Sequence, residues 1–181
     1  RGLGDVYKRQ YIRLGFSSYA DGKIYMDDYF EKNVEEAQEN GIDVGVYFFS
    51  QAVTTEEAVK EAKYVLSNIK GRNVSLPIGF DMEPVTENDR IKALTVEQKT
   101  EVADAFGCIM KKHGRETLIY GNPDWIANNI DLTLLTDYEI WLAHYTSMSS
   151  FEYDYTMWQY SSTGRVDGIN TNVDLNIMFV K

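Results

Sequence analysis

Short apolar runs alternate with amphipathic segments over the first two thirds of this 181-residue chain. The runs have the length and the β-branched or aromatic content of strands, and they are Tyr11–Gly15, Val44–Phe49 and Pro77–Glu83. The amphipathic segments carry apolar residues three and four positions apart, which predicts helices over Asp27–Asn40, from Thr54 to Gly71 and from Thr95 onward. Thr54 with Glu57 and Thr95 with Gln98 predict capping boxes at the starts of the last two helices. A strand that recurs after each helix is typical of parallel βαβ units, so the sequence predicts an α/β fold.

The remainder of the chain predicts strands with little helix between them. The expected elements are strands over Thr117–Tyr120, Glu139–Tyr145, Thr156–Ser161 and Val173–Val180, and a short helix over Pro123–Asn129. Three or four βα units followed by bare strands predict a barrel whose second half has lost its helices. No internal repeat or linker interrupts the pattern, so a single domain is expected.

Composition argues against several classes of partner. A formal net charge of −10 and an isoelectric point near 4.7 oppose binding to nucleic-acid phosphates or to an anionic membrane surface. No apolar run approaches the roughly 20 residues that span a bilayer, and no signal peptide is visible at the start. The single cysteine, Cys108, excludes a disulfide within the chain. We therefore expect neither a nucleic-acid partner nor a membrane partner.

Two carboxylates mark the end of the third predicted strand. In I-G-F-D-M-E-P, Asp81 and Glu83 are separated by one residue, so in extended backbone their side chains point to the same face, roughly 6.6 Å apart at Cα. Pro84 then ends the ladder because it has no N–H to donate. Active sites of α/β barrels lie at the carboxyl ends of the strands. We therefore predict catalytic roles for Asp81 and Glu83.

Glycosidic bond cleavage is a reaction that such a pair would serve. It needs an acid that protonates the leaving oxygen and a group that stabilises the positive charge on the sugar carbon. The close spacing of Asp81 and Glu83 favours a retaining geometry, because an inverting one needs a wider gap for water. Each carboxylate raises the pKa of the other, and apolar surroundings keep one of them protonated. A D-x-E motif is also common on protein surfaces, so the motif alone does not establish this function.

Further candidate residues lie near the ends of other predicted strands. Asp174, in N-V-D-L-N, would orient the pair or the substrate, and it fits a cap on the preceding Asn-rich turn equally well. His144 is at a strand end, where it would bind a ligand or serve the structure. Six aromatic residues are candidates for a sugar platform: Tyr47, Tyr120, Trp141, Tyr145, Trp158 and Tyr160. Aromatic residues at such positions are also common in ordinary cores.

Motifs of several other enzyme classes are missing from the sequence. There is no His or Cys cluster for zinc, no glycine loop for phosphate, and neither G-x-S-x-G nor H-E-x-x-H. The acids Asp81, Glu83 and Asp174 would still suit a hard cation such as Mg²⁺ or Ca²⁺. A metal-dependent reaction therefore stays open on the residues alone.

Six segments of the chain occur in the same order in one enzyme family. They read Y-I-R-L-G-F-S-S-Y, N-V-E-E-A-Q-E-N-G-I-D-V-G-V-Y-F-F-S-Q-A, E-A-V-K-E-A, P-I-G-F-D-M-E-P, I-W-L-A-H-Y and W-Q-Y-S-S-T-G-R-V-D-G-I-N-T-N-V-D-L-N. Together they resemble the glycoside hydrolase family 25 lysozymes, whereas any one of them would be a weak match. The resemblance covers residues 11–181 and implies a single catalytic domain, an irregular TIM-like (β/α)5(β)3 barrel.

The resemblance also implies a reaction and roles for single residues. Glu83 is similar to the family's proton donor, Asp81 to the acid that positions or stabilises the substrate N-acetyl group, and Asp174 to the acid of the closing V-D-L-N. Tyr47 and the W-Q-Y segment match positions that line the sugar groove. The implied reaction is hydrolysis of the β-1,4 bond between N-acetylmuramic acid and N-acetylglucosamine, without a metal or other cofactor. Peptidoglycan glycan strands are the implied partner, at a secreted or cell-wall-associated location.

One feature of the family is not matched. Family members begin with a strand that reads like G-I-D-V-S, whose Asp belongs to the active site, and a helix that precedes the strand matching Tyr11–Gly15. Only ten residues precede Tyr11, fewer than a strand and a crossover need, and we leave residues 1–10 as an unassigned leader. The expected barrel is therefore N-terminally incomplete. Exposed strand edges would then lower its stability or pair two copies as a homodimer.

Three functions are consistent with these residues. The leading hypothesis is a peptidoglycan hydrolase with a retaining, substrate-assisted mechanism, whose activity the incomplete barrel would impair. The second is a non-catalytic domain that keeps the aromatic groove and binds cell-wall glycans. The third is a metal-dependent phosphodiester hydrolase, which the small number of histidines disfavours.

Overall fold

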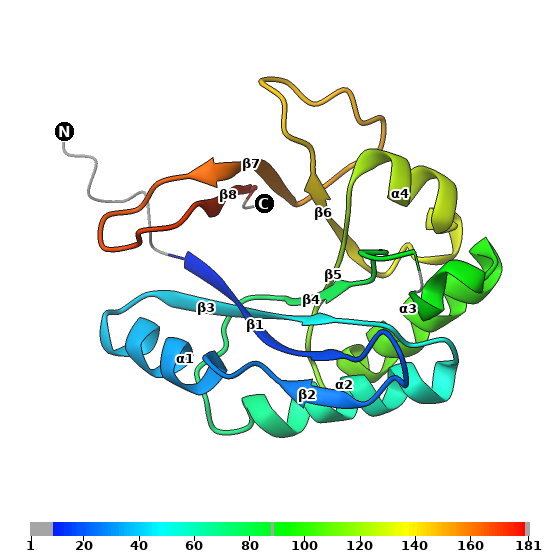
Figure 1. Cartoon of the computed structure of the whole chain (residues 1–181), viewed down its shortest axis with the longest axis horizontal. Coiled ribbons are helices and arrows are strands. Elements are labelled where there is room, and N and C mark those ends of the chain that lie inside the picture. The colour runs from blue at the N-terminus through cyan, green and yellow to red at the C-terminus, as the bar shows by residue number, and fades with distance from the viewer. Residues whose placement is uncertain (1–8, 88, 180–181) are drawn as a thin grey trace.

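One curved sheet of eight strands organises the fold (Figure 1). A computed structural model of the chain describes residues 9–87 and 89–179. The strands are β1 (Arg9–Ser17), β2 (Ile24–Met26), β3 (Asp43–Phe49), β4 (Ile78–Asp81), β5 (Thr117–Gly121), β6 (Glu139–Ala143), β7 (Met157–Gly164) and β8 (Val173–Met178). Their order across the sheet is β2-β1-β3-β4-β5-β6-β7-β8. Over the described residues the sheet thus has two ends, and it forms an open half-barrel.

The strand pairing confirms the predicted parallel arrangement. The six strands from β1 through β3 to β7 are parallel to one another, and β2 and β8 are added antiparallel at the two ends. The α-helices are α1 (Phe30–Glu39), α2 (Thr55–Ile69), α3 (Val96–Lys112) and α4 (Pro123–Asn129). They lie on the outer side of the sheet, while β6, β7 and β8 follow one another without an intervening α-helix (Figure 1). This is the predicted irregular (β/α)5(β)3 type of fold in an open form.

The first turns of α2 and α3 can be compared with the predicted capping boxes. At α3 the Thr95 side chain accepts the Gln98 N–H at 3.2 Å, and the Gln98 side chain accepts the Thr95 N–H at 3.0 Å, a complete capping box. At α2 the Thr54 side chain accepts the Glu57 N–H, as predicted. The Glu57 carboxylate, however, binds the Arg90 guanidinium at 2.9 Å rather than reaching back to Thr54. The box predicted at Thr54 is therefore half formed, because the Glu57 carboxylate accepts the Val53 N–H, at 2.9 Å, and binds Arg90 instead of the Thr54 N–H.

The hairpin that contains β2 was not predicted from the sequence. The chain turns through Gly22, whose φ of +67° suits glycine, and β2 then pairs antiparallel with Gly15–Ser17 of β1. Gly15 permits this approach, because a Cβ there would lie 2.3 Å from the Tyr25 carbonyl oxygen. A strand of three residues is too short to reveal a period of two. Its sequence therefore reads as part of a loop.

Two predicted boundaries fall near the limits of the described residues. Arg9 and Gln10, which belong to the segment 1–10 without a predicted structure, are the first residues of β1 and pair with β3. Residues 1–8 lie outside the described part of the chain, and so does Val180, the predicted end of the last strand, while β8 ends at Met178. Pairing of two copies through the free strand edges stays a prediction.

The two faces of the sheet carry different cores. The main core lies between the sheet and helices α1 to α3 and includes four fully buried phenylalanines: Phe30, Phe48, Phe80 and Phe106. On the inner face a smaller cluster packs Leu118 and Met157 around Trp141. Side chains of β4 alternate between these faces, so Phe80 enters the main core and Asp81 faces the inner side. The carboxyl end of β4 therefore presents its acid on the side without helices.

Candidate active site

The two predicted catalytic acids meet at the carboxyl end of β4. Asp81 is the last residue of the strand, is 7% exposed and lies level with Phe49 of β3 and Tyr120 of β5. Glu83 follows two residues later, while Met82 between them is buried in the main core. Both carboxylates line the same cavity, as their spacing predicted. The hydrogen-bonded ladder ends at Asp81, two residues before the predicted end of the strand.

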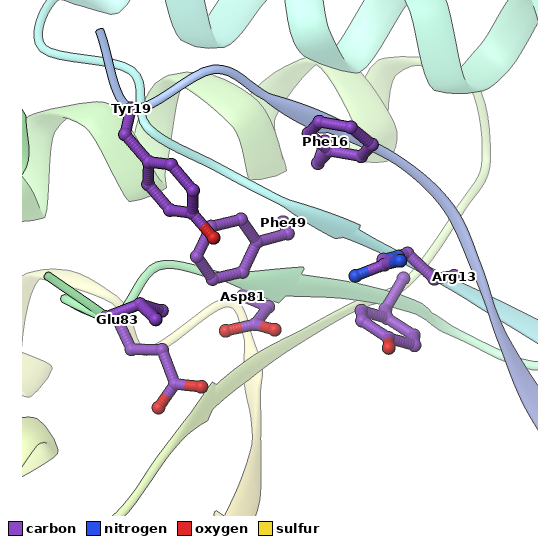
Figure 2. Close-up of a pocket in the computed structure, with 8 residues that line it drawn as sticks. Arg13, Phe16, Tyr19, Phe49, Asp81 and Glu83 are labelled. Atoms are coloured by element: carbon purple, nitrogen blue, oxygen red, sulfur yellow. The ribbon is translucent and has the colours of Figure 1, made fainter. Parts of the chain in front are cut away.

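The cavity has a volume of about 340 Å³ and is formed by the carboxyl ends of three strands and the segments that follow them. Its lining residues are Arg13, Phe16, Tyr19, Tyr47, Phe49, Asp81, Glu83 and Val85. Figure 2 shows the Asp81 and Glu83 carboxyl groups below the rings of Tyr19 and Phe49, with the Arg13 guanidinium on the other side of Asp81. The site thus combines a carboxyl pair, one guanidinium and flat apolar rings.

Burial is the main cause of the raised pKa values of Asp81 and Glu83. Burial raises the pKa of Asp81 well above its ordinary value, the neighbouring Glu83 raises it further, and Arg13 opposes both effects. Burial also raises the pKa of Glu83. Among the described residues, the buried Oδ1 atom of Asp81 has no hydrogen-bond partner. Two adjacent carboxyl groups that resist ionisation can share a proton, hold it in reserve and deliver it to a bound substrate.

An aromatic cluster continues the site across the inner face of the sheet. Trp141 is buried, and its ring centroid lies 4.7 Å from that of Tyr11, 5.1 Å from Tyr120 and 6.0 Å from Tyr47. Its Nε1–H donates to Asn176 Oδ1 of β8 at 2.8 Å. Trp141 of β6 thus contacts tyrosines of β1, β3 and β5 and is hydrogen-bonded to β8. It supports the floor of the site and does not itself line the cavity.

The tyrosines near the acids are held as protonated hydroxyl groups. Burial and the Asp81 charge raise the pKa of Tyr47 to about 12. Burial, followed by Glu83 and Asp81, raises the pKa of Tyr120 further still. The hydroxyls of Tyr120 and Tyr145 both donate to Gln159 Oε1 of β7, at 3.1 and 2.6 Å. One glutamine therefore orients two of the predicted sugar-binding residues.

Asp174 lies at the border of this cluster. It is the second residue of β8 and is exposed, and partial burial of its carboxyl raises its pKa. Its charge raises the pKa of Tyr145 and that of Tyr47. Asp174 therefore shares the face of the sheet with the acid pair without lining the cavity, and its catalytic role stays a prediction.

Three other predicted residues lie away from the cavity. Trp158 packs against a separate cluster of Ile126, Ile140 and Leu142, and its Nε1–H donates to the His144 carbonyl at 2.8 Å. Tyr160 contacts the Trp158 ring at 6.1 Å. The His144 ring nitrogen Nδ1 is 3.1 Å from Ser149 Oγ. Alternation along β7 places Trp158 and Tyr160 opposite to Gln159. Sugar binding by these three residues stays a prediction.

Five lining residues were not singled out from the sequence: Arg13, Phe16, Tyr19, Phe49 and Val85. Arg13 carried the clearest signal, since a charged residue inside an otherwise apolar strand needs a partner. Its Nε donates to Asp27 Oδ2 at 2.7 Å, just before α1. The other four are apolar or aromatic residues at strand ends, which sequence alone cannot distinguish from core residues.

The described residues also bear on metals and membranes. No group of three or more His, Cys, Asp or Glu side chains in residues 9–87 and 89–179 is arranged to hold a metal ion. Asp81, Glu83 and Asp174, the acids that a metal-dependent hydrolase would use, therefore do not form such a group in this part of the chain. In the same part of the chain, every helix is too short or too polar to cross a bilayer.

Comparison with known families identifies the family of the chain. Residues 6–169 match the model of the family described as Glycosyl hydrolases family 25. The chain belongs to this family. The family 25 chain is 29% identical over 176 residues to Lysozyme M1 of Streptomyces globisporus, an alignment that covers 91% of this chain and 59% of that lysozyme. It spans a similar 59% of the first curated relatives that it matches.

Solved structures share the fold of the family 25 chain. A family 25 glycosyl hydrolase from Bacillus anthracis superposes with a TM-score of 0.76 at 24% identity, covering 96% of this chain and 79% of the other. The modular autolysin LytC from Streptococcus pneumoniae, in complex with a synthetic peptidoglycan ligand, gives a TM-score of 0.77 at 23% identity, covering 93% and 40%. At these identities the likeness establishes the fold alone.

Proposed function

We propose that this family 25 domain hydrolyses the β-1,4 bond between N-acetylmuramic acid and N-acetylglucosamine in peptidoglycan. The observation that carries the proposal is the carboxyl pair Asp81 and Glu83, which faces one cavity and has raised pKa values for both members. Relatives support the choice of substrate, since one is named as a lysozyme and LytC was solved with a peptidoglycan ligand. Glycan strands are therefore the proposed partner, at the cell wall.

Glu83 is the proposed general acid. It is less buried than Asp81, and burial favours its protonated form. In the free protein burial raises the pKa of Asp81, and Arg13 only partly opposes this rise. In the proposed complex the N–H of the substrate acetamido group at Asp81 adds to the effect of Arg13 and favours the ionised form of Asp81, which leaves the proton shared by the pair on Glu83. The proton on Glu83 then passes to the glycosidic oxygen as the bond from that oxygen to the anomeric carbon breaks.

Asp81 is the proposed stabiliser of the intermediate. Its unpaired Oδ1 accepts the N–H of the substrate acetamido group, whose carbonyl oxygen bonds to the anomeric carbon and forms an oxazolinium ion. Glu83, now ionised, takes a proton from a water that attacks the same carbon, and the acetamido group is released. Two successive inversions retain the configuration. Asp174, exposed on β8, would contact the sugar from the side of Tyr145.

The test of these roles is release of muropeptides from purified peptidoglycan. Glu83→Gln should lower the rate by at least about 100-fold, because it removes the proton that general acid catalysis requires. Glu101→Gln, which changes an exposed residue of α3, is the matched control and should keep the wild-type rate. NMR of the first product should show the β-anomer if the configuration is retained. An undiminished rate for Glu83→Gln would disprove the assignment.

The rings that line the cavity support one second candidate, a domain that binds glycans without cleaving them. Phe16, Tyr19, Tyr47 and Phe49 offer flat apolar surfaces for sugar rings whether or not the acids react. Isothermal titration with a purified muropeptide distinguishes the two functions. Saturable binding with no product after prolonged incubation would favour the binding domain, whereas turnover would exclude it.

A further inference from the structure

A carboxyl group outside the cavity occupies an unusual place on α2. Glu61 is 2% exposed, and it lies on the same stripe of the helix as the buried residues Ala58, Ala62 and Val65. Its Oε1 accepts a hydrogen bond from Ser17 Oγ, and its Oε2 accepts one from Ser50 Oγ at 2.7 Å. An apolar side chain at this position would bury the same surface without the desolvation of a carboxyl group. A buried carboxyl group at this position of α2 is therefore expected to have a specific role.

The two serines that bind Glu61 lie at the carboxyl ends of β1 and β3, on the same edge of the sheet as the candidate active site. Ser17 is the last residue of β1, and Ser50 directly follows β3; both are completely buried. The Ser50 N–H donates to the Asp81 carbonyl at 2.7 Å. Glu61 is thus connected to the backbone of Asp81 through one residue. It also fixes the end of β1, the strand that carries Arg13.

The charged groups around Glu61 do not neutralise it. Glu57, one turn earlier on α2, opposes its ionisation, and Arg90 favours it weakly. Arg90 is already bound to Glu57 through both terminal nitrogens, at 2.9 and 3.1 Å. The hydroxyls of Ser17 and Ser50 are therefore the direct partners of the buried carboxyl. Burial outweighs them and raises the pKa of Glu61 to about 7.

We propose that Glu61 is a positioning residue, which clamps the carboxyl ends of β1 and β3 and through Ser50 fixes the backbone that carries Asp81. As a role in catalysis this rests on the proposed hydrolysis, since it explains how Asp81 and Arg13 are held at the spacing that the reaction needs. Ser50 is the connecting element because its hydroxyl faces the helix and its N–H faces β4. Small displacements of catalytic groups are costly, about 100-fold in rate for 1 Å.

Three variants of the complete chain separate positioning from simple stability. Glu61→Met fills the volume but removes both acceptors, and it should lower kcat about 10- to 100-fold with little change in KM. Glu61→Gln keeps one acceptor and a polar group for each serine, so it should restore most of kcat. Glu56→Gln alters an exposed acid on the same helix and should match the wild type. Rates are expressed per folded molecule, measured by circular dichroism.

A second readout does not depend on activity. Hydrogen exchange by NMR reports the Ser50 amide, which should exchange faster in Glu61→Met than in the wild type or in Glu56→Gln. If the wild type releases no muropeptides, the proposed hydrolysis fails, while faster exchange of this amide still supports the clamp. The proposal is overturned if folded Glu61→Met keeps the wild-type exchange rate at Ser50, or if it keeps the wild-type kcat while the wild type is active.

Discussion

Glu61→Gln should change how the stability of the protein depends on pH. Burial raises the pKa of Glu61 from 4.5 to about 7 in the folded protein. Between these pH values the folded chain therefore holds a proton that the unfolded chain has lost. The free energy of unfolding is highest below the unfolded pKa and falls as pH rises toward the folded pKa. A glutamine does not titrate, so the substitution should abolish this part of the decline.

The size of the effect follows from the two pKa values. A tenfold change in proton affinity corresponds to about 1.4 kcal/mol. With 4.5 in the unfolded chain and about 7 in the folded one, ionisation of Glu61 lowers the free energy of unfolding by about 2 to 3 kcal/mol between pH 5 and pH 8. Because Glu61 is 2% exposed, solvent screening reduces this value little. A change of this size exceeds the usual error of urea unfolding experiments.

Urea unfolding at pH 5, 6, 7 and 8, followed by tryptophan fluorescence, measures the difference between variant and wild type. The free energy of unfolding of Glu61→Gln should gain about 2 to 3 kcal/mol relative to the wild type over this range. Glu56→Gln is the control, because the exposed Glu56 has a lowered pKa and should give a constant difference. A constant difference for Glu61→Gln as well would show that its carboxyl is solvated in the folded protein, and the burial argument would be refuted.

Three further predictions concern the core, a helix end and the site. Phe106→Ala removes a fully buried ring whose centroid lies 4.9 Å from that of Phe80, so urea unfolding should show a loss of about 3 to 5 kcal/mol, and a loss below 1 kcal/mol would contradict the packing. Thr95→Ala breaks the capping box of α3 and should cost about 1 kcal/mol in the same assay, whereas Thr95→Ser should be nearly neutral. Arg13→Gln removes the charge that lowers the pKa of Asp81, so the acid limb of the pH profile of muropeptide release should move to higher pH; an unchanged limb would exclude this role.

Local patterns predicted the parallel strands and their helices well. Val44–Phe49 and Ile78–Asp81 read as strands because both faces of a parallel sheet are buried, which produces uninterrupted apolar runs. Capping residues located the starts of α2 and α3. The hairpin of β2 was not predicted, because three residues are too few to show the alternation of a strand. Its pairing also depends on Gly15 in another strand. Whether a sheet closes is likewise a property of its ends, which short-range patterns do not describe.

The acids of the candidate site were predictable, and most of their surroundings were not. Asp81 and Glu83 were predictable because burial of two charges at the end of an apolar strand is costly, which indicates a functional role. Gln159 and Arg13 act from strands that are distant in sequence, so their approach depends on the register of the sheet. The sequence does contain a signal for Glu61, because this residue falls on the apolar stripe of α2, where a surface acid would not lie.

The position of β4 within the sheet gives the two sides of the site different mobility. It is fourth in an order of eight strands, so Asp81 is hydrogen-bonded into the interior of the sheet, whereas Asp174 and Asn176 belong to the terminal strand β8. Terminal strands fray at low energetic cost, while central ones open only with global unfolding. The strand that carries Asp81 is therefore held rigidly on both sides. β8, which lies beside the site, can open locally at a lower cost, and this would suit the proposed substrate, a polymer that must be admitted along its length.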